Sequence, residues 1–217
     1  MTRIVLIGCG GHGRAVAELI AGLAHYTLAG VVDPSGASLP AAPNLGGDDV
    51  LKTLGRQGIA AAAIGVGSIG NTALRHRIFD AAVQAGLELP ALVHPTAYVS
   101  PSATLAAGVI VMPRAVVHAG ATVGQAVIVN TGAIVEHDCR IGAFSHLSPA
   151  SVLGGHVRMG ADVHVGLGAC VRDRVTLAAG CVVGAGAAVV GDVPEAMVVV
   201  GVPAKPLVKK KKERGHD

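Results

Sequence analysis

The sequence predicts two parts: a small α/β domain with a Rossmann-like parallel sheet over residues 1–93, and an all-β parallel β-helix over residues 94–197. A C-terminal segment at 198–217 follows them. Two observations support this division. Short apolar runs alternate with helical stretches at the start, which is typical of a parallel sheet. From residue 99 to residue 194 the chain then keeps an unbroken period of six, which is typical of stacked repeats.

The α/β part is expected to contain four strands and three helices. Apolar runs bounded by glycine, proline or aspartate predict strands at residues 4–7, 28–32, 60–65 and 87–93. Helical patterns lie between them at residues 15–23, 48–54 and 72–85.

Sixteen hexads define the second part. Their first residue is always Val, Leu, Ile or Met, and their fifth is always Ala, Val, Ser or Cys. Six residues suit one short strand and one corner, so three hexads close a triangular coil. The first position should then fill the interior and the fifth should pack near a corner. Coils stack at about 4.8 Å, so residues eighteen apart become neighbours.

Composition fits a narrow apolar prism, because the chain is 51% hydrophobic and 14% charged, with two Tyr, two Phe and no Trp. No apolar run approaches the ~18 residues of a membrane-spanning helix, and the apolar run at the start is too short for a signal peptide. We therefore expect a cytoplasmic protein without membrane insertion.

Charge and cysteine content suggest no further partner. Much of the net charge of +3 lies in the lysine run at 209–212, which we interpret as a solvated tail rather than a nucleic-acid contact. The four cysteines have no CxxC spacing, and Cys139 and Cys181 occupy the small fifth position, so we expect them to be packing residues.

A glycine-rich loop follows the first strand. Gly8, Gly10 and Gly13 match GxGxxG, and Asp33 lies twenty residues further on. The domain is too small for a complete dinucleotide fold, so we expect backbone N–H groups at a helix N-terminus to hold a phosphate or diphosphate. Asp33 could accept a hydrogen bond from a base or ribose. The alternative is that the glycines only make a tight turn. Candidate substrate-binding residues are Gly8, Gly10, Gly11, His12, Gly13, Asp33, Gly67 and Asn71.

The densest polar group of the β-helix is Glu136-His137-Asp138. His137 has a suitable ordinary pKa for a general base, and either neighbouring carboxylate could hold its tautomer. Gly155 lies eighteen residues beyond His137, where its N–H could stabilise an oxyanion. This group could accept a proton from an amine that attacks a thioester.

The same spacing gathers other histidines into one polar column. His146 should stack with His164, His156 should lie above Asp138, and His118 should lie below Glu136. We interpret His118, His156 and His164 as surface residues, and leave His146 open between ligand contact and surface residue.

Three stretches resemble the family of sialic acid O-acetyltransferases and nucleotide-amino-sugar N-acetyltransferases, which includes bacillosamine- and perosamine-type enzymes. They are residues 7–13 (IGCGGHG), 130–139 (NTGAIVEHDC) and 200–205 (VGVPAK). The resemblance implies a left-handed β-helix, a homotrimer and acetyl-CoA bound between adjacent β-helices. It implies that His137 is the base and Asp138 its partner, with Asp where bacillosamine-type enzymes have Glu. Residues expected near the coenzyme are His146, Gly155, Gly166, Pro203 and Lys205.

No metal is expected. Other left-handed β-helix proteins resemble γ-class carbonic anhydrases, which use two histidines five apart on one coil. The β-helix histidines of this chain lack that spacing; they are His118, His137, His146, His156 and His164.

The sequence therefore predicts an acetyl-CoA-dependent N-acetyltransferase that acts on a UDP- or GDP-linked 4-amino-4,6-dideoxy sugar, with the glycine loop and Asp33 at the nucleotide. Two alternatives stay open: a sialic acid O-acetyltransferase, which differs only in its acceptor, and a non-enzymatic nucleotide-binding trimer. An NAD-dependent enzyme is the least favoured interpretation.

Overall fold

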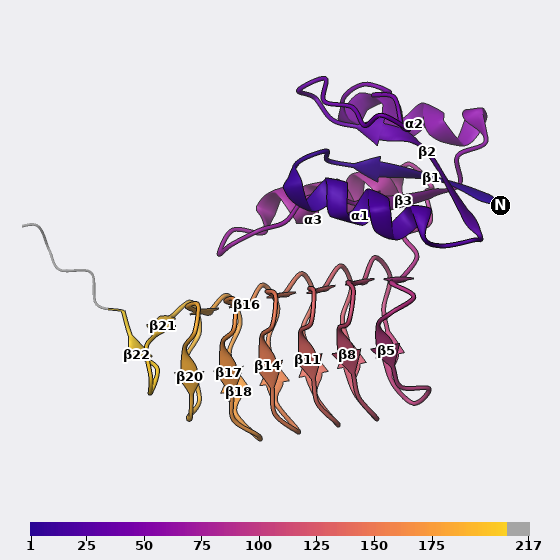
Figure 1. Ribbon diagram of the computed structural model, residues 1–217. Helices are drawn as coiled ribbons and strands as arrows, with labels where there is room; N and C mark the ends of the chain where they lie inside the picture. Colours follow the sequence, from indigo (N-terminus) through magenta and orange to yellow (C-terminus); the bar gives the residue numbers. More distant parts are fainter. Residues whose placement is uncertain (208–217) are drawn as a thin grey trace, which may run out of the picture.

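The computed structural model describes residues 1–207, so the lysine run at 209–212 lies outside the described residues. The N-terminal part is a parallel three-stranded sheet in the order β2-β1-β3 with helices around it (Figure 1). Its strands are Thr2–Ile7 (β1), Tyr26–Val32 (β2) and Ala61–Ile64 (β3). Its helical segments are Gly11–Ala21 (α1), Asp48–Val50 (η1), Leu51–Leu54 (α2), Gly55–Gln57 (η2) and Ala73–Gln84 (α3). These elements confirm the three helical stretches and three of the four expected strands.

The expected fourth strand at 87–93 is wrong. Glu88 makes only an isolated bridge to Ala61, and the one strand in this segment, Leu92–Val93 (β4), belongs to the β-helix instead. Pro90 explains the interruption, because proline has no N–H to donate to a sheet ladder. The apolar run therefore crosses from one domain into the other.

The second part is a left-handed parallel solenoid of about six turns. Its strands recur every six residues with two residues each, as the hexads predict: Tyr98–Val99 (β5), Thr104–Leu105 (β6), Ile110–Val111 (β7), Val116–Val117 (β8), Thr122–Val123 (β9), Ile128–Val129 (β10), Ile134–Val135 (β11), Arg140–Ile141 (β12), His146–Leu147 (β13), Val152–Leu153 (β14), Arg158–Met159 (β15), His164–Val165 (β16), Cys170–Val171 (β17), Thr176–Leu177 (β18), Val182–Val183 (β19) and Ala188–Val189 (β20). Val198–Val200 (β21) and Lys205–Pro206 (β22) close the end of the solenoid.

Three sheets of eight, six and five strands form the sides of the solenoid, and every pairing in them is parallel except that of β21 with β22. First- and fifth-position side chains fill the interior, as the sequence predicts. Cys139 and Cys181 are fully buried among them, and burial raises the pKa of each thiol to about 11. Both cysteines are therefore packing residues, as expected.

The six-residue repeat ends one hexad earlier than predicted. Val193 bridges Leu177, and Val199 pairs with Val183, so both pairs are separated by sixteen residues instead of eighteen. A shortened turn explains the difference, since the carboxylate of Asp192 accepts a hydrogen bond from the Thr176 N–H at 2.7 Å. Val193 thus takes an inward first position rather than the fifth position that the hexad count gives it.

The N-terminal domain lies along the eight-stranded side of the solenoid, with α1 and α3 packed towards it (Figure 1). Arg75 of α3 is buried and donates hydrogen bonds to the carbonyls of Phe144, at 2.8 Å, and Ala126. His76 adds a hydrogen bond from its Nε2 to the Asp162 carboxylate at 2.7 Å. These contacts join α3 to successive coils. Among residues 1–207, no helix has the length and apolarity needed to cross a membrane.

The outward residues of the strands differ between the three sides. The eight-stranded side carries apolar residues and two histidines under the N-terminal domain. The five-stranded side carries only Thr and Arg outward. The six-stranded side carries an almost wholly apolar column, Tyr98, Val116, Ile134, Val152, Cys170 and Ala188.

Candidate active site

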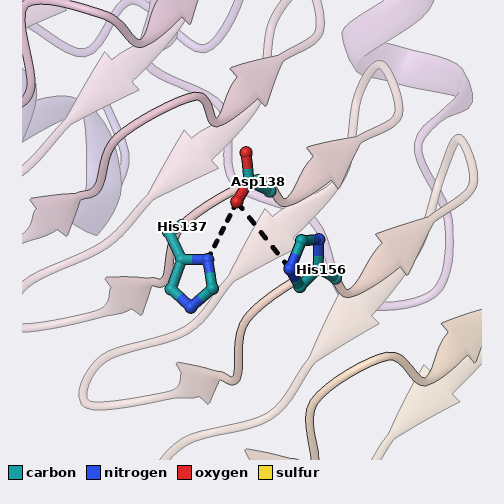
Figure 2. Close-up of side chains that lie close together, drawn as sticks. All are labelled: His137, Asp138 and His156. Carbon is teal, nitrogen blue, oxygen red and sulfur yellow. Dashed lines mark hydrogen bonds and ion pairs between the residues drawn. The ribbon is translucent and has the colours of Figure 1, made fainter.

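His137 and Asp138 form a hydrogen-bonded pair at the corner between the six-stranded and five-stranded sides (Figure 2). They follow β11 and precede β12. The His137 Nδ1 lies 2.9 Å from the Asp138 Oδ2, and both side chains are about half exposed. Because a carboxylate can only accept, Nδ1 carries the proton and Nε2 keeps a free lone pair. The imidazole is therefore held in the tautomer that a general base needs.

The coil above leaves room for this imidazole. A Cβ at Gly155 would lie 2.6 Å from the His137 Nε2, so the ring directly faces the glycine backbone. The Gly155 N–H has no acceptor within the part of the chain that the structure describes. A proton acceptor thus lies beside a residue whose backbone donor is free within residues 1–207, and an acyl-transfer site requires both kinds of group.

The electrostatics of the pair favour an ionised carboxylate. The hydrogen bond from His137 lowers the pKa of Asp138, and the nearby His156 contributes in the same direction. The Glu136 carboxylate accepts a hydrogen bond from the His137 backbone N–H at 3.2 Å, so it does not hold the imidazole. Of the two carboxylates that the sequence left open, the structure selects Asp138.

Two grooves meet at this corner. One of about 420 Å³ is lined by Glu136, His137, Gly154, Gly155, His156, Asp173 and Arg174. The other, of about 440 Å³, is lined by Gly120, Thr122, Asp138, Arg140, His156, Arg158, Arg174 and Thr176. The pair therefore lies at an accessible, polar edge of the solenoid.

A second polar group lies under the N-terminal domain, on the eight-stranded side. His146 opens β13, and its Nδ1 donates to the Ser68 carbonyl at 3.0 Å. Its Nε2 lies 3.1 Å from the Asn130 amide nitrogen and accepts a hydrogen bond from it. Burial lowers the pKa of His146 to about 4, so this ring is neutral at physiological pH.

Two further histidine rings flank His146. His164 lies on the next coil, as the spacing predicts, with its ring edge-on to that of His146 and the centroids 5.2 Å apart. His164 is buried, so its interpretation as a surface residue is wrong. His164 is buried because the N-terminal domain covers this side of the solenoid, and the hexad spacing does not predict where that domain lies. His12 of the glycine loop lies 6.4 Å from His146 on its other side. Within residues 1–207 the buried His12 Nε2 has no hydrogen-bond partner, and burial lowers the pKa of that ring to about 4.

The glycines of the loop divide into two kinds. A Cβ at Gly8 would lie 2.5 Å from Val66, and one at Gly13 would lie 2.3 Å from the Gly8 carbonyl oxygen. These two are needed for close packing of the turn. Gly10 and Gly11 have nothing within 4 Å of such a Cβ, so packing does not require them. They leave the N-terminus of α1 uncrowded, while the binding of a phosphate or diphosphate there stays a prediction.

Asp33 holds the ends of β1 and β2 together. Its Oδ2 accepts from the Cys9 N–H at 2.8 Å, and its Oδ1 accepts from the N–H and hydroxyl of Ser35. The hydrogen bonds from Ser35, followed by the one from Cys9, lower the pKa of Asp33. Its carboxylate therefore shapes the loop, and a contact to a base or ribose stays a prediction.

The loop between β3 and α3, which contains Gly67 and Asn71, also has a local role. Gly67 faces His12, since a Cβ there would lie 3.7 Å from the Cβ of that residue. The Asn71 Oδ1 accepts from the Ala73 N–H at 3.0 Å, which caps the start of α3. The loop therefore approaches the glycine loop, while direct contacts of Gly67 and Asn71 with a substrate stay predictions.

The remaining coenzyme candidates lie towards the end of the solenoid. Gly166 is required by packing, because a Cβ there would lie 2.6 Å from the backbone N of Ala185 in the next coil. Pro203 is exposed beside β22. Lys205 lines a cavity of about 350 Å³ beside the last turn. Coenzyme contacts by these residues stay predictions.

Within one chain the expected site is divided into two halves. His137, Asp138 and Gly155 lie at the far corner of the prism, whereas His146 and the glycine loop lie on the side that the N-terminal domain covers. No hydrogen bond or ion pair among residues 1–207 joins the halves. The single polar column that the sequence predicts is therefore two columns on different sides.

The structure adds residues that sequence reasoning missed. Arg75 holds the loop that carries Ser68. Asn130 completes the hydrogen bonds of His146. A buried arginine in an amphipathic helix and an asparagine before a glycine turn have no periodic signal, so only the packed domains identify them. His137, Asp138 and His156 also form a group of three potential metal ligands, with ligand atoms within 4.8 Å of one another.

The family model of the PglD N-terminal domain matches residues 3–82. No protein of curated function matches the chain. The acetyltransferase domain of PglB from Neisseria gonorrhoeae FA1090 is 41% identical, with 95% of this chain and 100% of that chain covered at a TM-score of 0.89. It is also known in complex with acetyl coenzyme A.

PerB from Caulobacter crescentus, solved in complex with CoA and GDP-perosamine, is 39% identical, with 96% of this chain and 98% of that chain covered at a TM-score of 0.90. Two structures of variants of that perosamine N-acetyltransferase, in which one histidine is replaced by asparagine or alanine, hold the same two ligands. WeeI from Acinetobacter baumannii AYE is 21% identical with a TM-score of 0.80, which supports the fold alone.

Proposed function

Because this chain belongs to the family of acetyl-CoA-dependent sugar N-acetyltransferases, we propose that it acetylates the amine of a nucleotide-linked 4-amino-4,6-dideoxy sugar, with His137 as the general base. The acetyl donor of the family is acetyl-CoA, and the chain is an acetyltransferase. The sugar, the nucleotide and the role of each residue are the proposal.

The reaction needs one proton acceptor and one oxyanion donor. The sugar amine attacks the thioester carbonyl, so a C–N bond forms while the C–S bond breaks. The His137 Nε2 takes the proton of the amine, and Asp138 stabilises the imidazolium through Nδ1. The Gly155 N–H faces the developing oxyanion. The imidazolium then protonates the leaving thiolate, which restores the base.

One observation carries this proposal: the only free ring nitrogen of the His137–Asp138 pair points at the Gly155 backbone. No nucleophilic side chain is needed, because direct attack requires only that both substrates are held close together. The open glycines at the N-terminus of α1 support a diphosphate there. A related perosamine N-acetyltransferase binds GDP-perosamine and CoA, which supports a nucleotide sugar as the acceptor.

We further propose that the enzyme is a homotrimer whose complete site needs two chains. The apolar column on the six-stranded side includes Tyr98, which is 52% exposed, and an uncovered apolar column of this kind favours packing against another copy. Such packing would bring the His137 corner of one chain next to the glycine loop of another. The division of the site into two halves supports this arrangement.

Thiol release from acetyl-CoA tests the reaction. We would compare UDP- and GDP-linked 4-amino-4,6-dideoxy sugars with free sialic acid, using the parent protein and His137→Asn. Release with one nucleotide amino sugar, lost in His137→Asn while both substrates still bind, is the expected result. Release only with sialic acid would replace the N-acetyl proposal by an O-acetyltransferase. Near-parental turnover in His137→Asn would refute the base assignment.

Complementation tests the shared site. His137→Asn removes one half, and Gly11→Glu places a carboxylate where the diphosphate should lie, at a position with no neighbour that a side chain would strike. Random mixing of the two inactive variants should restore activity in about a quarter of the sites if each site draws on two chains. Mixed oligomers with no activity would mean that each chain contains a whole site.

A further inference from the structure

His137, Asp138 and His156 bring three metal-ligand atoms together on two adjacent coils (Figure 2). The Asp138 Oδ2 lies 2.9 Å from the His137 Nδ1 and 3.8 Å from the His156 Nε2. The two imidazole rings are edge-on with centroids 5.1 Å apart. Asp138 is one residue after His137 and eighteen before His156, so this group differs from the pair of histidines five apart that γ-class carbonic anhydrases use.

These distances suit a tetrahedral zinc ion. Zinc binds imidazole nitrogen at about 2.0–2.1 Å and carboxylate oxygen at about 2.0–2.2 Å, so two ligand atoms of one ion lie about 3.3–3.5 Å apart. The two measured separations lie on either side of that value. Small rotations of the half-exposed side chains would equalise them. Two imidazoles, one carboxylate and a water make a set that zinc commonly accepts.

The surrounding charges leave room for a cation. The guanidinium groups of Arg140, Arg158 and Arg174 line the groove beside the three ligands. Glu136 and Asp173 line the adjoining groove at the same corner. With the Asp138 carboxylate, the corner has three negative and three positive charges. Because these charges balance, direct coordination by the three ligand atoms determines whether a cation binds. The grooves of about 440 and 420 Å³ provide the entry path.

We propose that His137, Asp138 and His156 form an inhibitory Zn²⁺ site that switches off the base. The inhibition rests on the function proposed above, whereas the binding does not. When zinc binds the His137 Nδ1, the single proton of the neutral ring moves to Nε2. That nitrogen, which faces Gly155, then becomes a donor and no longer accepts the proton of the amine. The metal also occupies the carboxylate that holds the ring.

Zinc binding is measured first by calorimetry, on a Cys170→Ser background that removes the exposed thiol. We expect one ion per chain. His156→Asn should weaken zinc binding at least about tenfold, the loss of one ligand. His118→Asn, at the same corner of the solenoid but outside the ligand group, is the matched control and should bind zinc like the parent. Equal affinity in parent and His156→Asn would overturn the site.

Thiol release is then followed against free zinc, with a chelator to define the metal-free rate. Half-inhibition, with each curve normalised to the metal-free rate of the same variant, should need at least about ten times more zinc in His156→Asn than in the parent. Zinc that binds at these residues without slowing turnover would overturn the inhibitory role. Full acetyltransferase activity without zinc binding refutes only this inference, whereas zinc binding in a protein inactive towards every acceptor refutes only the proposed function.

Discussion

Gly155→Ala should inactivate the enzyme without unfolding it. The added Cβ would lie 2.6 Å from the His137 Nε2, whereas an ordinary contact needs about 3.4 Å, so the ring must move by about 0.8 Å. The ring can move, because the His137 side chain is 52% exposed. A misplacement of about 1 Å in a catalytic group costs about 10²-fold in rate, so we expect kcat to fall roughly a hundredfold.

The assay is thiol release under saturating substrates, together with thermal unfolding. Gly155 has an ordinary φ, so alanine strains no backbone there, and Tm should stay within about 2 °C of the parent. Gly191→Ala is the matched control, because a Cβ there meets nothing within 4 Å. A Gly155→Ala protein with near-parental kcat would show that the base does not work from the observed ring position.

Three further predictions concern other contacts. Asp138→Asn should lower kcat about ten- to a hundredfold without weakening substrate binding. The loss should be smaller than the roughly 10²–10⁴-fold that a general base supplies, because the half-exposed carboxylate only orients the ring. Unchanged kcat would contradict the orienting role of Asp138. The pKa of His146 is about 4 in the folded state against 6.5 for the free side chain, so the unfolded chain binds the proton first and stability falls on acidification. Over that window His146 alone contributes a loss of about 1.4 kcal/mol per pH unit, so in denaturant titrations the unfolding free energy of His146→Asn should fall less steeply than that of the parent by about this amount, whereas His25→Asn should keep the parental slope. His12 and His164, whose pKa values burial also lowers, account for the slope that remains in His146→Asn. Arg75→Met leaves two carbonyls without their donor and should cost about 2–4 kcal/mol in chemical unfolding, whereas exposed Arg77→Ala should cost under about 0.5 kcal/mol; equal losses would contradict the bridging role of Arg75.

The period of six carried most of the solenoid. It predicted sixteen strands in register and the burial of the first and fifth residues of each hexad. This pattern is clear because the narrow interior of the solenoid accommodates few kinds of side chain. It failed where a side chain changed the turn, at Asp192. In the α/β part, the apolar run at 87–93 failed to predict a strand because Pro90 interrupts it. Such local interactions are invisible to a pattern that records only apolarity.

The candidate site was predicted in its chemistry and not in its arrangement. His137, Asp138 and Gly155 could be brought together by counting eighteen residues, because each coil repeats the one before. The burial of His146 and His164 could not be predicted from the spacing, because it depends on how the N-terminal domain lies against one side of the solenoid. No periodic signal encodes that docking; it rests on contacts such as those of Arg75.

The proposed catalytic pair depends on glycines in the coils on both sides of it. Gly155, eighteen residues after His137, gives the ring its space, and Gly120, eighteen residues before Asp138, gives the carboxylate its own. A Cβ at Gly120 would lie 2.6 Å from the Asp138 Oδ1.

The φ of Gly120 is +68°, yet Asp138 and His156 adopt φ of 59° at the same position of their coils, so the backbone alone does not demand glycine at 120. Gly120→Ala should therefore fold, at a cost of about 1–2 kcal/mol for the left-handed residue. It should lower kcat less than Gly155→Ala does, because it displaces the orienting group and not the base. If Gly120→Ala lowered kcat as much as Gly155→Ala, the carboxylate would have to do more than orient the ring.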